Sequence, residues 1–357
     1  MAAIWKRGNY WRVEIRRLGQ PRQNRSFDTK AEADAWARQV EAKMDRGELA
    51  DLKELKEAER NTLGDLLLRY SEKISPQKKG GDLEILRIRK LCAEPIAQIK
   101  VSELRRKHMA DYRDRRLAGD LESKPVSGST VNRELNLLSH VLNVATKEWG
   151  IHVAVNPVSA IRRPKENRAR CRRLRRPDGE TPSEEERLLA QLEVKPRTTS
   201  GAYAPGGCRN EYARPTVMLA IETAMRRSEL LGLLWPDVHL ADRYVQLHDS
   251  KNGEPRDVPL STRAVQILTE LSKKPRHASG RVLLISPEAL KKSFTRACER
   301  AGIKNLHFHD LRHEATSRIA ERLDNVLELS AVTGHKTVQI LRRYYHPRAS
   351  DLALKLG

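Results

Sequence analysis

A strongly basic run near the middle of the chain limits how the sequence can fold. The stretch RRPKENRARCRRLRR, residues 162–176, holds nine Lys and Arg residues against a single Glu. Such a charge run is usually left in solvent, because burying unpaired charges is costly. The chain has 357 residues, which is too long for one ordinary core and predicts two or three domains. We therefore expect a basic connector between domains over residues 161–180.

The charge of the whole chain predicts a polyanionic partner. Lys and Arg together number 68 and Asp and Glu number 47, which gives a formal net charge of +21. A surplus of this size favours nucleic acid over a membrane surface. No apolar run is long enough to span a bilayer, and the N-terminal MAAIWKRGNYW lacks the apolar centre of a signal peptide. We expect a cytoplasmic protein without a membrane partner. Its four scattered cysteines, with no CxxC pair, predict reduced thiols.

Residues 1–52 read as a small β-sheet followed by a helix. Apolar and charged residues alternate in WRVEIR at 11–16, which predicts a half-buried strand, and a second short strand is expected at 25–27. Arg12 and Arg16 fall on one face of the first strand. That face can be a solvated surface or a β-ribbon in the major groove of DNA, and the residues alone leave both open.

Residues 60–160 predict an all-helical domain. The clearest helix spans residues 130–149, with Ser129 or Thr130 as its cap. Arg133 lies off its apolar face and can face phosphate. The apolar residues recur at helical spacing and predict a buried stripe: Val131, Leu135, Leu138, Leu142, Ala145 and Trp149.

The connector has two interpretations. It can be a solvated linker, or a strap that follows the DNA backbone. In the second case each phosphate contact would release counterions and make the affinity salt-dependent. The candidate phosphate contacts are Arg162, Arg163, Lys165, Arg172 and Arg173.

Residues 181–357 predict a further, mainly helical domain with one β-hairpin. Apolar runs at 244–247 and 256–260 flank HDSKNGEP, whose Asn-Gly dipeptide suits a tight turn. The Gly-rich stretch 195–211 reads as an irregular insertion, to which we assign no role.

This last domain carries residues that can do chemistry. Arg226 and Arg227 fall within an apolar sequence that reads as one helix, and two arginines at a buried turn need anionic partners. Glu229, three residues after Arg226, can orient its guanidinium. His309 and Arg312 are also three apart and would share a helix face. Taken alone, an HxxR pair is common in helices.

Taken singly, the other candidate residues of this domain have ordinary structural explanations. Lys251 on a turn is by default an exposed lysine, and His335 an ordinary loop or helix-start histidine. Either of the adjacent tyrosines, Tyr344 and Tyr345, can be a nucleophile or a packing residue, because both fit a helical apolar stripe. Histidines also occur at a spacing that metal ligands use, namely His307, His309 and His313. No convergent set of Asp and Glu residues completes the site of a metal-dependent nuclease.

Together these residue types suit attack on a DNA phosphodiester. A tyrosine phenolate that attacks phosphorus places negative charge on the non-bridging oxygens, which two arginines can neutralise. A lysine can protonate the departing 5′ oxygen, and histidines can donate hydrogen bonds or move protons. The tyrosine stays joined to one DNA end, so rejoining needs no ATP, and the chain has no GxxxxGK[ST] loop. No metal and no other cofactor is expected.

The order of these candidate residues along the chain resembles that of the tyrosine recombinases, specifically phage-type and genomic-island integrases. The family signature is Arg, Lys, His-x-x-Arg, His or Trp, and Tyr, and RRSELLGL, KNGEPRDVPL, HDLRHEA and GHKT also resemble family motifs. Family nucleophiles lie nine residues after the His of the GH motif, which selects the first tyrosine of RRYYHP. The resemblance implies these catalytic residues, with Glu229 in support: Arg226, Lys251, His309, Arg312, His335 and the nucleophile Tyr344.

The resemblance also implies a fold and a function. The fold is mainly α with small β elements. An arm-type DNA-binding module is expected at 1–52, a helical core-binding domain at 60–160, a basic linker at 161–180 and a catalytic domain of the tyrosine recombinase type at 181–357. The function implied is site-specific strand exchange through a 3′-phosphotyrosyl intermediate, which integrates or excises a mobile element at the bacterial nucleoid.

The partners implied are double-stranded DNA attachment sites and further copies of the chain in a tetramer on DNA. The C-terminal DLALKLG is expected to dock on a neighbouring protomer. A host DNA-bending protein and an excisionase are further candidates, because bridging distant DNA sites needs bent DNA. Two alternatives are a catalytically inactive sequence-specific DNA-binding protein and type IB topoisomerase-like relaxation.

Overall fold

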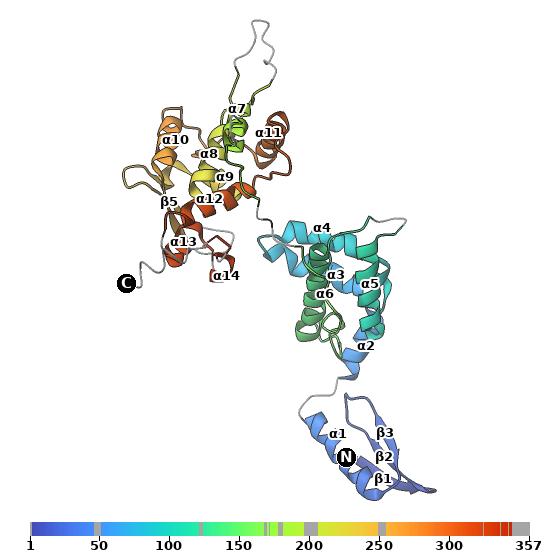
Figure 1. Ribbon diagram of the computed structural model, residues 1–357. Helices are drawn as coiled ribbons and strands as arrows, with labels where there is room; N and C mark the ends of the chain where they lie inside the picture. The colour runs from blue at the N-terminus through green and yellow to red at the C-terminus, as the bar shows by residue number, and fades with distance from the viewer. Residues whose placement is uncertain are drawn as a thin grey trace, which may run out of the picture. The chain divides into compact units, whose positions relative to one another are not determined.

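The computed structural model describes two compact units. It covers residues 2–45, 51–120, 124–167, 170, 172–177, 181–195, 206–248, 255–323, 325–335, 337–341 and 343–344. The units are Met1–Arg168 and Ala169–Gly357, so the division falls inside the predicted basic connector. Figure 1 shows the helices and strands of each. The expected fold class, mainly α with small β elements, is confirmed.

The N-terminal residues form a three-stranded antiparallel sheet packed on one helix. The sheet order is β1 (Ala2–Arg7), β2 (Tyr10–Ile15), β3 (Gln23–Phe27), and α1 (Lys30–Asp45) follows. Val13 and Ile15 of β2 are buried in a cluster with Ala33 and Ala37 of α1. Strands β2 and β3 match the two that the sequence predicts. Strand β1 adds a third, and its AAIWKR sequence lacks the alternation that would have indicated it.

The rest of the first unit is helical and has a hydrophobic cluster of its own. In the cluster, Leu63 and Leu67 pack with the buried face of the long sixth helix. The helices are α2 (Leu52–Arg60), α3 (Leu63–Lys73), α4 (Gly81–Cys92), α5 (Arg106–Ala118) and α6 (Gly128–Glu148), with 3₁₀ turns at Ser75–Gln77, Pro95–Gln98 and Val101–Glu103.

Helix α6 is the long helix expected at residues 130–149, with one correction at its start. The expected cap, Ser129 or Thr130, lies inside the helix. The cap is Ser127, whose hydroxyl accepts from the backbone N–H of Thr130 because its own backbone is extended. The predicted stripe is buried from Val131 to Ala145, while Trp149 is partly buried and stacks under Arg69.

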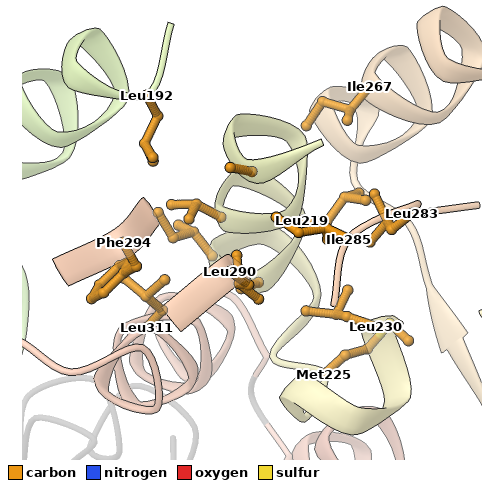
Figure 2. Close-up of a cluster of buried hydrophobic side chains, with 14 of the residues drawn as sticks. Leu192, Leu219, Met225, Leu230, Ile267, Leu283, Ile285, Leu290, Phe294 and Leu311 are labelled. Carbon is orange, nitrogen blue, oxygen red and sulfur yellow. The ribbon is translucent and has the colours of Figure 1, made fainter. Parts of the chain in front are cut away.

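The second unit surrounds one central helix. Helix α8 contacts α7, α9, α10, α11 and α12. Figure 2 shows the side chains that meet there, among them Leu219 of α8, Leu230 of α9, Leu290 of α11 and Leu311 of α12. The helices are α7 (Glu184–Gln191), α8 (Ala213–Thr223), α9 (Arg227–Gly232), α10 (Thr262–Ser272), α11 (Pro287–Arg300), α12 (Asp310–Ala320), α13 (Val326–Thr333) and α14 (Val338–Leu341).

A small antiparallel sheet completes this unit. Its order is β4 (Val238–His239), β5 (Tyr244–Leu247), β6 (Arg256–Pro259), with a 3₁₀ turn at Trp235–Asp237 before it. Strands β5 and β6 form the predicted hairpin, and Val245 pairs with Val258 in its buried centre. The Asn-Gly turn lies outside the described residues. Across the described ranges, no helix is long and apolar enough to cross a membrane.

The apolar sequence around Arg226 and Arg227 is not one helix, so that expectation was wrong. Helix α8 ends at Thr223, Ala224 has a left-handed backbone with φ 53°, and α9 starts at Arg227. The left-handed residue costs energy for a non-glycine side chain, and buried contacts on both sides hold it. The break gives Arg226 an extended backbone at the junction of two helices.

Truncating a leucine in α6 should destabilise the first unit. Leu138 is fully buried, so Leu138→Ala should cost about 3 kcal/mol through lost burial and a cavity. Hydrogen exchange of α3 and α6 amides measures this. Leu83→Ala in α4 is the matched control, because Leu83 is 70% exposed and its loss should change exchange little. Equal effects of the two substitutions would contradict the buried packing of α6.

Candidate active site

Arg226 is fixed by a carboxylate one helical turn away. As the N-cap of α9 it donates its backbone N–H to Oε2 of Glu229 at 2.8 Å, and its Nη1 donates to Oε1 at 2.7 Å. Its Nη2 donates to the carbonyl of Gly334 at 3.3 Å. Glu229 is buried, so the charge of its carboxylate needs these partners. The direction of the Arg226 side chain is thereby set by both the helix start and the turn after α13.

A second arginine, which the sequence did not indicate, binds the same carboxylate. Arg256 of β6 donates from Nη1 to Oε1 of Glu229 at 3.1 Å and from Nη2 to Oε2 at 2.7 Å. Burial by itself raises the pKa of Glu229, but the hydrogen bonds from Arg256 and Arg226 outweigh burial and lower this pKa to about 2. Glu229 is therefore a carboxylate at neutral pH and bridges two guanidinium groups.

The turn after α13 approaches this cluster closely enough to require glycine. Gly334 has φ +66°, and a Cβ there would meet the guanidinium of Arg256 at 2.8 to 2.9 Å. A side chain at this position would have to displace an arginine that is locked by Glu229. The glycine of the TGH sequence thus lets the backbone lie against the arginine cluster.

Arg312 lies in the first turn of α12 and is only 5% exposed. Its Nη1 donates to the carbonyl of Ala224, and its Nη2 donates to the carbonyl of Thr333 at 2.6 Å. Burial and the neighbouring charge of Arg226 lower the pKa of Arg312 to about 10, so it stays charged at neutral pH. Two guanidiniums held close together in this way favour an anion between them.

His335 is held as a neutral imidazole beside Arg312. The Thr333 hydroxyl donates to the carbonyl of Leu329 at 2.6 Å, so its oxygen accepts from Nδ1 of His335 at 2.7 Å. Nε2 then carries no proton and accepts from Nη2 of Arg312 at 3.4 Å. Burial and the charges of Arg312 and Arg226 lower the pKa of His335 to about 3.

Tyr344 lies three residues after the end of α14, and its ring is close to those of two histidines. Its hydroxyl and Nδ1 of His313 form a hydrogen bond, and the two rings are stacked with centroids 5.7 Å apart. The centroid of His335 is 6.1 Å from the tyrosine ring. His313 also contacts His309 edge to face at 5.3 Å. Burial and the charge of Arg312 lower the pKa of His309.

The structure therefore brings together most of the catalytic residues that the family resemblance implies. Lys251 and Tyr345 lie outside the described residues, as does the C-terminal DLALKLG. The residues brought together are Arg226, Glu229, His309, Arg312, His335 and Tyr344.

His313 and Arg256 complete the cluster, and sequence reasoning assigned neither to the site. His313 was weighed only as a metal ligand, although its spacing from His309 places both on one helix face. Among the described residues no group of His, Cys, Asp or Glu side chains could hold a metal ion. No local signal could have found Arg256, because its partner lies 27 residues away.

The predicted DNA contacts divide into exposed and ion-paired arginines. Arg133, Arg162, Arg163 and Lys165 are exposed in the first unit, where Arg12 of β2 is partly exposed. Arg16 pairs with the buried Glu14, which also breaks the predicted alternation of β2. In the second unit Arg172 pairs with Glu184 at 2.7 Å and Arg173 with Glu314 at 3.1 Å. These last two guanidiniums hold buried carboxylates of α7 and α12, so a phosphate would compete with them.

The chain is similar to known proteins over most of its length. The model of the phage integrase family matches residues 181–351. A shufflon-specific DNA recombinase of Escherichia coli is 38% identical over 298 residues, which cover 83% of this chain and 71% of the relative. A putative integrase/recombinase of Haemophilus influenzae is 31% identical over 99% of this chain and 88% of its own length.

Solved structures have the same fold at low identity. A lambda integrase tetramer bound to a Holliday junction matches with a TM-score of 0.60 and 18% identity, over 97% of this chain and 95% of that chain. The Tn1549 transposon integrase in complex with circular intermediate DNA matches with a TM-score of 0.61 and 17% identity, over 83% of this chain and 99% of that chain.

Removing one of the two guanidiniums that bind Glu229 should destabilise the second unit. Arg256→Gln leaves a buried carboxylate with a single arginine, which should cost about 3 kcal/mol. Adding Glu229→Gln should not recover this loss, because Arg226 then loses the carboxylate that binds it. Hydrogen exchange of the α9 and β6 amides measures both. Arg296→Gln on the exposed face of α11 is the control, and an equal loss there would contradict the Glu229 bridge.

His335 should make the free protein sensitive to acid. Its pKa is lowered from 6.5 to about 3 on folding, so below about pH 6.5 the unfolded chain binds a proton that the folded chain does not. Stability should therefore fall as pH drops through this window. His335→Gln should show a smaller loss of Tm between about pH 7 and about pH 5 than the wild type. His277→Gln, at an exposed site, should leave the loss of Tm unchanged. If His335→Gln lost as much Tm as the wild type, the neutral, partly buried imidazole would be contradicted.

Proposed function

The chain belongs to the phage integrase family and is a tyrosine-type site-specific DNA recombinase, and from this premise we propose that Tyr344 is the nucleophile that opens and reseals a DNA strand. The observation that supports this is the position of its hydroxyl, hydrogen-bonded to His313, with the ring beside His335, which contacts the buried Arg312. A phenol near buried guanidiniums is placed where a phosphate would be bound.

The proposed reaction assigns each side chain a part. The Tyr344 oxygen forms a bond to phosphorus, and the bond from phosphorus to the 5′ oxygen breaks. Arg226 and Arg312 bind the non-bridging oxygens, while Lys251 gives a proton to the departing 5′ oxygen. His309 donates a hydrogen bond to the phosphate, and His335 can do so from Nε2 only after that nitrogen has gained a proton. The product is a 3′-phosphotyrosyl bond, which a 5′ hydroxyl from a second strand attacks to reverse the step.

The electrostatics of the cluster support a phosphate at this position. Glu229 balances one of the two guanidiniums that it holds, and among the described residues the acceptors of the Arg312 guanidinium are two carbonyls and His335. Burial is the main cause of the lowered pKa of Arg312, and the positive charge of Arg226 lowers it further. A bound phosphate would relieve this repulsion and would return the pKa of Arg312 and His335 toward their ordinary values.

The substrate we propose is duplex DNA at attachment sites, bound by a tetramer of this chain. The net charge of +21 supports this, as do the complexes of lambda integrase and Tn1549 integrase with DNA. Residues 1–52 are proposed as the arm-type module and 60–160 as the core-binding domain, joined by a linker at 161–180 to a catalytic domain at 181–357. A host DNA-bending protein and an excisionase remain predicted partners. The proposed backbone contacts are Arg12, Arg16, Arg133, Arg162, Arg163, Lys165, Arg172 and Arg173.

The biological outcome we favour is integration and excision of a mobile element. A second outcome, inversion of a segment between two sites, uses the same strand exchange and is favoured by the relative named a shufflon-specific recombinase. The relatives' names do not favour an inactive DNA-binding protein or a topoisomerase. Recombination assays with directly repeated and inverted sites separate excision from inversion.

Substituting the proposed nucleophile should abolish covalent trapping of DNA. A nicked suicide substrate loses the strand end that would reseal the break, so the wild-type protein should accumulate a protein–DNA adduct on a denaturing gel. Tyr344→Phe should form no adduct, because its ring lacks the attacking oxygen, and should still bind DNA. Tyr345→Phe is the matched control and should trap DNA close to the wild-type level. Adduct formation by Tyr344→Phe would refute the assignment.

A further inference from the structure

The hydrogen bond between His313 and Tyr344 is not accounted for by the residues that the family signature names. His313 lies one helical turn after His309 on α12, and Tyr344, which follows α14, is 31 positions after His313 in the sequence. Their rings are nearly parallel, with 22° between the planes. The tertiary structure thus sets an imidazole nitrogen directly against the oxygen that the proposed function makes the nucleophile.

The surroundings of His313 keep it neutral in the free protein. Burial lowers the pKa of His313 first, and His309, Arg312 and Arg343 lower it further, while Asp310 acts in the opposite direction. His335 also lies close to the tyrosine ring and is itself neutral. A neutral imidazole with its proton on Nε2 offers the lone pair of Nδ1 to the tyrosine hydroxyl. The hydrogen bond is then donated by Tyr344 and accepted by His313.

We propose that His313 is the general base of strand cleavage, an inference that rests on Tyr344 being the nucleophile. As the Tyr344 oxygen bonds to phosphorus, its proton passes to Nδ1 of His313. The bond to the 5′ oxygen breaks, and that oxygen takes a proton from Lys251. In the reverse step the imidazolium of His313 returns the proton to the departing tyrosine oxygen, so protons and charge balance in both directions.

Substrate binding strengthens this base at the moment it is needed. The charges that oppose an imidazolium in the free protein are those of Arg312 and Arg343. A phosphodiester bound by Arg226 and Arg312 adds a negative charge nearby, which favours the protonated form of His313. The tyrosine is therefore weakly activated without DNA and more strongly activated with the phosphate in place.

The first experiment measures single-turnover cleavage of the nicked suicide substrate as a function of pH. His313→Gln keeps an acceptor for the tyrosine hydroxyl but cannot take its proton, and should cleave about 100-fold to 10,000-fold more slowly than wild type. The wild-type rate should fall at low pH as the base becomes protonated, and this acid limb should be absent in His313→Gln. His307→Gln, at an exposed histidine just before α12, is the matched control and should keep the wild-type profile.

The second experiment replaces the bridging 5′ oxygen of the substrate with sulfur, which leaves as a thiolate without needing a proton. This substrate should rescue Lys251→Ala, which lacks the proposed acid, and should not rescue His313→Gln. DNA binding and Tm, measured alongside, should be the same in His313→Gln and wild type. Rescue of His313→Gln by sulfur would place His313 on the leaving-group side and overturn the proposal.

The remaining outcomes are also decisive. If His313→Gln cleaves at the wild-type rate and keeps the acid limb, the proposal that His313 is the general base is overturned. This holds even if His313→Ala is slow, because the hydrogen bond would then only position the tyrosine ring. Tyr344→Phe separates this failure from failure of the proposed function. If Tyr344→Phe forms no adduct while His313→Gln behaves as wild type, the nucleophile stands and only the base is refuted. If Tyr344→Phe still forms an adduct, the proposed function itself fails.

Discussion

One buried carboxylate, that of Glu229, holds the candidate site together. It accepts hydrogen bonds from the guanidiniums of Arg226 and Arg256 and from the backbone at the start of α9. Without it, these arginines and Arg312 would repel one another in a region from which water is largely excluded. With it, the cluster keeps a positive charge that a phosphate can use. Glu229 therefore lets one buried arginine, Arg312, and two partly buried arginines lie close together.

The ends of two helices supply the remaining partners of the arginines. Helix α8 ends before Ala224 and helix α13 ends at Thr333 and Gly334, and all three residues give their carbonyls to guanidiniums. Carbonyls at a helix C-terminus lack intrahelical donors and carry partial negative charge. The left-handed backbones of Ala224 and Gly334 end these helices where the arginines lie. The fold thus pairs the free carbonyls at the helix ends with the N–H groups of the arginines. It leaves the outer face of the cluster for substrate.

The sequence predicted elements well where the signal was local. Periodicity and turn residues predict the apolar stripe of α6, the β5–β6 hairpin and strands β2 and β3. The break at Ala224 could not be predicted, because apolar residues continue across it and its carbonyl is bound by Arg312, a residue far away in the sequence. Arg256 and His313 were not assigned to the site for a related reason: each is defined by a partner far away in sequence, Glu229 for Arg256 and Tyr344 for His313. Roles for the catalytic residues came from family resemblance, since helical spacing fits Tyr344 and Tyr345 equally.

The account requires that the oxygen of Tyr344 becomes bonded to the DNA phosphate. Cutting the covalent adduct with nuclease and trypsin should release the peptide YYHPR, residues 344–348, because arginines precede and end it. Fragmentation in a mass spectrometer then locates the phosphoryl group on one of its two tyrosines. The account predicts the modification on Tyr344 alone. A phosphoryl group on Tyr345, or DNA cut without any attached peptide, would contradict it.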